Sequence, residues 1–282
     1  MPLDYRLRAE RSTSMRAMVV GWRLRLALVA AAAAAPACSP RLNLGSEFLW
    51  LAQHETGDLS EWTEGGKGGT SADMPDTSLA VSTDFAHSGK YSVKLSNAAV
   101  TNYETARLWR SDNYPEEAYY SAWYYLPRAY QTTDDWIIMQ IRAPVPQDPT
   151  TISLLFDIDL RSVPGGDMIV TVFDHRPQYL RAPTPDPAIP VPIGAWFQLV
   201  AYFRNVADDT GRLTLWLDGQ LMYDLHRPSG FNQTVYFTPC SVSEDLSPVA
   251  SVIYMDDAGV SLAQVGAAVP TDSSVTADAQ SR

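Results

Sequence analysis

Apolar and polar residues alternate along two neighbouring segments in the second half of the chain. Residues 197–204 and 213–217 place leucine, phenylalanine or alanine at every second position, which is the period-two pattern of a half-buried strand. Between them lies Ala207-Asp208-Asp209-Thr210-Gly211, whose aspartates and glycine suit a tight turn, and Asp218-Gly219 offers a second turn. The pattern predicts consecutive β-hairpins.

The same pattern recurs along most of the chain. A first strand is predicted from residue 48, followed by a glycine-rich loop that ends at residue 69, and further strands are predicted at residues 91–95, 106–110, 118–126, 136–142, 154–160, 168–173 and 252–257. Residues 177–194 are rich in proline and predict an extended loop. Because no helical periodicity follows residue 37 and no repeat of fixed period is present, we expect an all-β sandwich of two antiparallel sheets in a single domain over residues 48–262.

The first 37 residues have a different composition. Arginines precede an apolar run, residues 26–35, which is too short to span a bilayer and is typical of a signal peptide. Ala35-Pro36-Ala37-Cys38 resembles a bacterial lipoprotein box, although leucine is usual where Ala35 stands. We therefore expect an exported protein with a lipidated Cys38 on a tether over residues 38–47, held at the membrane only through that lipid; ordinary secretory cleavage and an uncleaved anchor are the alternatives. The small and polar residues 263–282 predict a disordered tail.

The charge and cysteine content narrow the class of partner. The formal net charge is −11, and loss of the arginine-rich leader would make it more negative. An acidic domain is unsuited to nucleic acid and to densely sulfated chains. Cys240 is the only cysteine besides Cys38, so a mature monomer, which is the state we expect, has no internal disulfide.

Four stretches carry a resemblance to a known family. They are HETGDLSEW at 54–62, HSGKYS at 87–92, the hairpin G-x-L-x-L-W-x-D-G at 211–219 and YMDDAGVS at 254–261. Together they resemble the polysaccharide-lyase-like β-jelly rolls, heparin-lyase-I-like and alginate-lyase-like, within the concanavalin-like lectin and glucanase superfamily. The resemblance implies a jelly-roll sandwich acting on a polysaccharide.

The resemblance also indicates candidate catalytic residues. WIIMQIR at 136–142 is similar to the Q-x-H strand of these lyases, with Gln140 in place and Arg142 where histidine is expected. An arginine neutralises a carboxylate but cannot act as a base near neutral pH, so the base lies elsewhere. YFTPCSV at 236–242 partly resembles the late strand that supplies a tyrosine, which makes Tyr236 the candidate there. His175 is the histidine we would test as a replacement base.

Substrate-binding candidates come from two kinds of segment. ARLWR at 106–110 partly resembles the arginine-rich substrate strand, with Arg110 at its final arginine. Aromatic residues crowd positions 119–125, where half belong in the core and the others, Trp123 among them, could stack on sugar rings. Tyr202 and Arg204 are the candidates on the 197–204 strand.

Carboxylates from the first and last strands suggest a cation. Glu55, Asp256 and Asp257 lie on strands that neighbour each other in such folds, and clustered carboxylates call for a counter-charge. Ca²⁺ accepts carboxylate and carbonyl oxygens, so a structural calcium is expected there; the alternative is that these acids cap turns or pair with arginine.

Three functions stay open at this point. The resemblance implies β-elimination on a uronate-containing polysaccharide by an exported lyase. A non-catalytic, lectin-like surface module is the alternative, so the sequence leaves open whether the protein is an enzyme. A glycosidase would use Asp157 and Asp159, which share a strand face with Arg161, but a polar strand face with an internal salt bridge explains these residues equally well.

Overall fold

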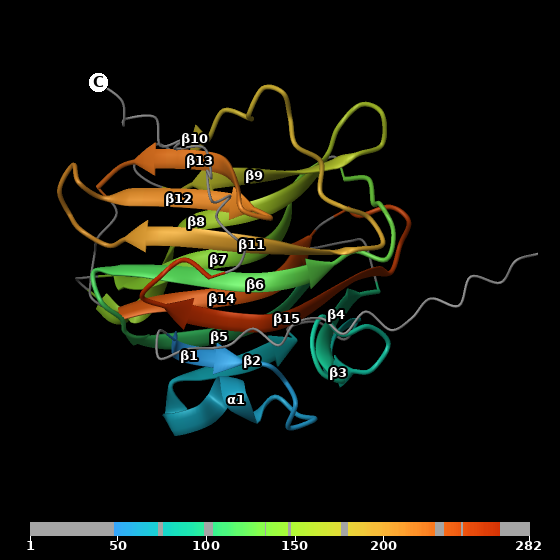
Figure 1. Cartoon of the computed structure of the whole chain (residues 1–282), viewed down its shortest axis with the longest axis horizontal. Coiled ribbons are helices and arrows are strands. Elements are labelled where there is room, and N and C mark those ends of the chain that lie inside the picture. Colours follow the sequence, from blue (N-terminus) through green and yellow to red (C-terminus); the bar gives the residue numbers. More distant parts are fainter. Residues whose placement is uncertain are drawn as a thin grey trace, which may run out of the picture. The chain divides into compact units, whose positions relative to one another are not determined.

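The computed structural model describes residues 48–72, 76–98, 104–132, 134–145, 148–175, 180–228, 234–243 and 245–265. The predicted signal peptide, Cys38 and its tether, and residues 266–282 of the predicted tail lie outside this part. Within it, no helix is long and apolar enough to cross a bilayer. Strands dominate (Figure 1), and the helical turns α1 (Ser60–Thr63) and η1 (Glu64–Gly66) are short.

One sheet has eight strands. Its order is β13-β12-β11-β6-β15-β4-β3, and β1 pairs with β15 outside this path. These strands are β1 (Phe48–Ala52), β3 (Thr77–Ser82), β4 (Ser92–Asn97), β6 (Glu117–Tyr125), β11 (Trp196–Arg204), β12 (Arg212–Leu217), β13 (Gln220–His226) and β15 (Ser251–Ser261).

The second sheet has seven strands in the order β10-β9-β8-β7-β14-β5-β2. They are β2 (Gly68–Ala72), β5 (Glu104–Asn113), β7 (Trp136–Val145), β8 (Asp148–Ser162), β9 (Met168–Asp174), β10 (Leu180–Arg181) and β14 (Thr234–Ser243). All pairings in both sheets are antiparallel, which confirms the predicted fold class.

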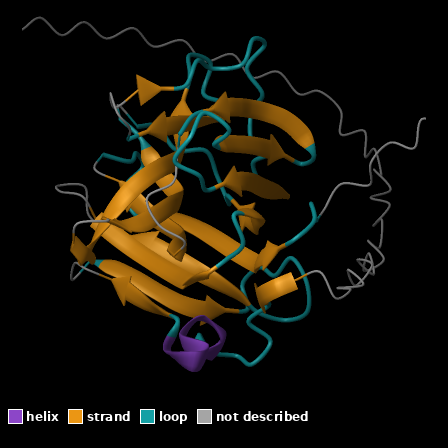
Figure 2. Cartoon of the chain, turned by 90° about the vertical axis from the view of Figure 1, so that its left-hand side faces the viewer, coloured by secondary structure: helices purple, strands orange, loops and turns teal. Residues whose placement is uncertain are grey.

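The core lies between the two sheets. Phe197, Leu199, Ala201 and Phe203 of β11 are fully buried, because every second residue faces the opposite sheet. Two tyrosine side chains of the eight-stranded sheet reach across this core to the other sheet. The Tyr124 hydroxyl group donates a hydrogen bond to the carbonyl of Ile138 at 3.1 Å, and the Tyr223 hydroxyl group donates one to the carbonyl of Val170 at 3.1 Å. Figure 2 shows the layered strands, with α1 at one edge.

The predicted hairpin is confirmed. Leu199 pairs with Leu217 and Phe203 with Leu213, and Asp218 and Gly219 take positive φ in the following turn. The Asp218 carboxylate accepts the Gln198 amide at 2.7 Å.

The glycine-rich segment after Trp62 differs from the predicted loop, because it ends in the edge strand β2. A Cβ at Gly68 would lie 2.3 Å from the carbonyl oxygens of both Trp62 and Trp109. Only glycine lets β2 approach β5 this closely.

Candidate functional site

The outer face of the seven-stranded sheet brings Gln140, Arg142 and Tyr236 together. Tyr236 pairs with Arg142 across β14 and β7, and Gln140 pairs with Thr238 on one side and Asp157 on the other. Paired residues in an antiparallel sheet project to the same face. The register therefore places the three candidate catalytic side chains next to one another on one face, while their roles stay a prediction.

Arg142 has no carboxylate partner in the described part of the chain, unlike Arg161, Arg181, Arg204, Arg212 and Arg227. Within the described residues no acid lies at ion-pair distance from it, and its Nε is buried without a hydrogen-bond partner. Burial, and secondly the nearby Arg107 guanidinium, lower the pKa of Arg142 from its ordinary value. An anion bound here would relieve both causes, since it would supply the missing charge and hydrogen bonds.

Asp157 connects Gln140 to a histidine. Its Oδ1 accepts a hydrogen bond from Gln140 Nε2 at 3.0 Å, and its Oδ2 lies 2.7 Å from Nε2 of His175. An ionised carboxylate only accepts hydrogen bonds, so the proton of a neutral His175 ring resides on Nε2. Nδ1 is then the nitrogen that can take up a proton.

Asp157, Asp159 and Arg161 share a strand face as predicted, and Asp159 and Arg161 are linked to each other through Arg181 and Asp135. Asp159 bonds Arg181 at 3.3 Å, and Arg161 pairs with Asp135 at 3.2 Å. Burial first, then repulsion from Asp157 and Asp135, raises the pKa of Asp159 well above its ordinary value. The set is a network of salt bridges, which favours the structural alternative over a glycosidase pair.

Arg110 does not reach this face. It points to the opposite side of β5, where its Nη1 donates to the carbonyl of Glu64 at 2.6 Å and its guanidinium lies 5.5 Å from the Trp50 ring centroid. Arg107, three residues earlier, is the arginine near Arg142. Arg107 and Arg110 are three residues apart on β5, so alternation places them on opposite faces of the sheet. Arg107, and not Arg110, therefore shares the face of Arg142.

Trp123, Tyr202 and Arg204 lie on the outer face of the other sheet. The Trp123 ring stacks on His87 with centroids 3.8 Å apart, and Tyr202 contacts another tyrosine ring at 5.2 Å. Arg204 pairs with Glu116 at 3.1 Å. The core separates these three residues from Gln140 and Arg142, so the structure does not unite the predicted substrate-binding and catalytic sets.

The acids predicted to bind calcium meet where β1 and β15 pair, but other groups occupy their oxygens. Asp256 accepts the His87 amide at 2.9 Å and contacts His54 Nδ1 at 3.3 Å; Asp257 lies 2.6 Å from His87 Nδ1. Glu55 accepts the backbone amides of residues 90 and 91. No group of three potential metal-ligating side chains is found in the described part of the chain, so calcium stays a prediction and enters no step below.

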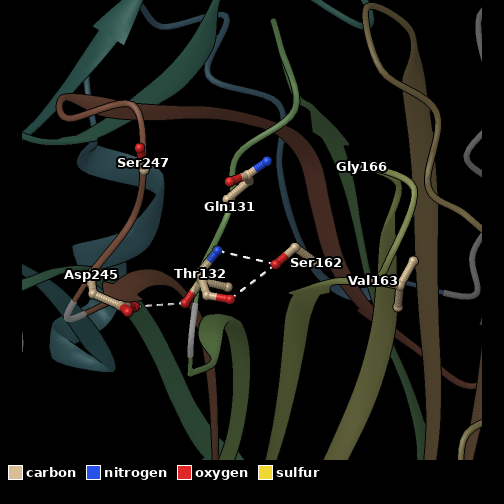
Figure 3. A pocket seen from close by; sticks show the side chains of 7 residues that line it. All are labelled: Gln131, Thr132, Ser162, Val163, Gly166, Asp245 and Ser247. Atoms are coloured by element: carbon tan, nitrogen blue, oxygen red, sulfur yellow. Dashed lines mark hydrogen bonds between the residues drawn. The ribbon is translucent and has the colours of Figure 1, made fainter.

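A shallow pocket lies at one end of the strands, away from these groups. Figure 3 shows that the polar side chains there face one another: Thr132 Oγ1 donates to Asp245 at 2.8 Å, and Ser162 Oγ donates to the Thr132 carbonyl at 2.9 Å. The lining residues are Gln131, Thr132, Ser162, Val163, Gly166, Asp245 and Ser247. None of them is a histidine, a tyrosine or an arginine, so the pocket contains none of the candidate catalytic residues.

Solved structures share this fold. An endo-β-1,4-glucuronan lyase from the fungus Trichoderma reesei superposes with a TM-score of 0.56 at 14% identity, covering 76% of this chain and 95% of that one. Cellulose induced protein Cip1 gives a TM-score of 0.53 at 15% identity, covering 77% and 99%. A variant of alginate lyase Aly36B in complex with an alginate trisaccharide gives 0.53 at 10% identity, covering 76% and 98%. At these identities the likeness concerns the fold.

The sequence itself carries the family relationship. A comparison with curated protein sequences gave no match. Residues 54–238, which include the Gln140, Arg142 and Tyr236 cluster, match the polysaccharide lyase family. The chain belongs to the polysaccharide lyase family.

Proposed function

We propose that the protein cleaves a uronate-containing polysaccharide by β-elimination on the outer face of the seven-stranded sheet. The observation that carries the proposal is Arg142, a partly buried cation without a carboxylate partner among the described residues. A uronate carboxylate supplies the missing charge. Glucuronan and alginate, the polysaccharides named for two structural neighbours, are built from uronate units.

The chemistry follows from the positions of the neighbouring groups. Arg142 neutralises the substrate carboxylate, which makes the adjacent C5 proton more acidic. His175 Nδ1 takes that proton while Asp157 holds the ring through Nε2. The C5 electron pair forms the C4–C5 double bond, the C4–O bond breaks, and the departing oxygen receives a proton from the Tyr236 hydroxyl group.

An absorbance assay tests this function. Full-length protein is incubated with glucuronan, alginate and other uronate polymers, and the ultraviolet absorbance of the unsaturated product is followed. We expect a rise that is lost in Arg142→Ala and Gln140→Ala and retained in Arg212→Ala, a control on the other sheet. A flat trace from folded wild-type protein, with binding of the same polymers by calorimetry, would replace the lyase by a carbohydrate-binding module.

We propose in addition that the protein is exported through its leader. The support is the arginine-rich and apolar composition of residues 1–37 ahead of Cys38. In a bacterial host, the wild type should fractionate with membranes and a Cys38→Ala variant with the soluble envelope fraction. Recovery of both from the cytoplasm would contradict export.

A further inference from the structure

Trp109 lies on the same outer face as Arg142 and is seated on a glycine. Its Cα pairs with that of Gly69 across β5 and β2. A Cβ at Gly69 would lie 2.4 Å from Cζ2 of the indole and 2.9 Å from Cε2. The ring therefore covers the α-carbon of Gly69, and any side chain at that position would displace it.

The environment of this ring differs from that of the other tryptophans. Every other tryptophan in the described part of the chain has an aromatic ring within 6.5 Å, whereas Trp109 has no such neighbour there. The indole is only partly buried. One side of the ring is occupied by Gly69, and its aromatic surface is not used by another aromatic side chain.

The strand between Trp109 and Gln140 contributes a second observation. Thr238 of β14 pairs with Gln140 and is fully buried, yet its Oγ1 has no hydrogen-bond partner among the described residues. Because this side chain has no exposed surface, it forms the floor between Trp109 and Gln140 and does not itself contact a ligand. β5 and β7 flank β14, so Trp109 lies two strand spacings, about 10 Å, from Gln140 and about 12 Å from Arg142, which is two residues further along β7.

We propose that Trp109 stacks on a pyranose ring of the polysaccharide, on a sugar unit next to or beyond the one whose carboxylate binds Arg142. The apolar C–H face of a pyranose packs well on an aromatic ring. The inference rests on the proposed function for the identity of the chain that crosses the sheet. It makes Trp109 a binding residue, which acts on affinity for longer chains and takes no part in the chemical step.

The test uses a series of uronate oligosaccharides of increasing length with full-length protein. Trp109→Leu keeps apolar bulk on Gly69 but removes the aromatic face, and Trp109→Phe restores an aromatic ring. Gly69→Ala displaces the indole from below. Trp216→Ala, on the other sheet, is the matched control, and thermal unfolding verifies that each variant is folded.

We expect Trp109→Leu and Gly69→Ala to raise KM for long oligosaccharides by about tenfold, with kcat and the KM of the shortest cleaved substrate unchanged. Trp109→Phe should recover most of the loss. Equal KM values for wild type and Trp109→Leu at every length would overturn the stacking role and leave the lyase intact. If wild-type protein neither binds nor cleaves any member, the proposed function fails, and the stacking role fails with it.

Discussion

The two outer faces of the sandwich both carry arginines paired with acids, such as Arg161 with Asp135 on the seven-stranded sheet, but that sheet also carries Arg142. On the eight-stranded sheet, Arg204 pairs with Glu116 and Glu117, and Arg212 pairs with Asp224. On the seven-stranded sheet, Arg142 has no such acid within the described residues. The charge of a paired arginine is balanced by the protein, whereas Arg142 lacks this balance within the described chain, which is why the proposed function gives it a substrate carboxylate.

The histidines repeat this contrast. His54 and Asp256 are both fully buried, and the His54 ring accepts a hydrogen bond from Trp62 Nε1 at 3.0 Å as well. The side chain of His175 is 17% exposed, and its Asp157 partner also holds Gln140. One Asp–His pair is enclosed in the fold, and the other reaches the outer face beside Arg142.

The largest expected effect is the loss of the proposed base. His175→Ala should lower kcat by about 10²–10⁴-fold, because no other histidine of the described chain lies in this cluster. Rates from the absorbance assay check this. His226→Gln, an exposed histidine on β13, is the control, and unchanged kcat in His175→Ala would assign the base to another residue.

His54→Ala should act on stability instead. Removing the ring leaves Trp62 Nε1 and one Asp256 oxygen without their partner and opens a cavity, which together cost about 3 kcal/mol of unfolding free energy. Urea unfolding measures this loss, and cleavage by the remaining folded protein should be unchanged. A stable but inactive His54→Ala variant would contradict the division between the two histidines.

Contacts between residues close together in the sequence can be predicted from the sequence pattern, whereas contacts between distant strands cannot. Gln140 and Arg142 lie two residues apart on one strand, so alternation alone places them on one face. The neighbourhood of His175 and Asp157 could have been predicted too, because the hairpin around residues 164–167 pairs Asp157 with Phe173, which makes His175 the diagonal neighbour of Asp157 on the same face.

Other contacts join strands that are distant in sequence. Alternation shows that Trp123 and Trp109 face away from the core, but it cannot tell which sheet each belongs to. Only the pairing of β5 with β2 and β14 brings Trp109 onto Gly69 and into the sheet of Arg142. Sheet order depends on the packing of the whole chain, which alternation does not reveal. For this reason the predicted substrate-binding residues Trp123, Tyr202 and Arg204 lie on the other sheet from Gln140 and Arg142.

Asp157→Asn should have a smaller effect than loss of His175. The amide can donate where the carboxylate only accepted, so the proton of His175 is no longer held on Nε2 and the ring loses its fixed orientation. A fall in kcat of about 10²-fold or less is expected, with a changed pH profile as the mark of positioning. An unaltered profile with an equal fall in kcat at every pH would favour a purely structural role.

The smallest effects compare one aspartate from each sheet. Arg212 holds the pKa of Asp224 at about 2, below the unfolded value, so ionised Asp224 stabilises the fold above about pH 4 and this contribution is lost as the pH falls towards 2. Burial raises the pKa of Asp159 instead, so the effect of Asp159 on folding stability changes with pH in the opposite direction. Above about pH 4 the unfolded chain releases the Asp159 proton before the folded protein does, and the folded protein loses stability as the pH rises.

Asp224→Asn should therefore lower the melting temperature slightly at pH 7 and not at pH 2, since an exposed ion pair contributes about 1 kcal/mol or less. Asp159→Asn, which keeps an oxygen acceptor for Arg181, should gain on the wild type as the pH rises from 4 to 8. Thermal unfolding at a series of pH values measures both differences. If the two variants shifted in the same direction with pH, the contrast between a paired surface carboxylate on the eight-stranded sheet and a strained buried one beside the proposed active site would be lost.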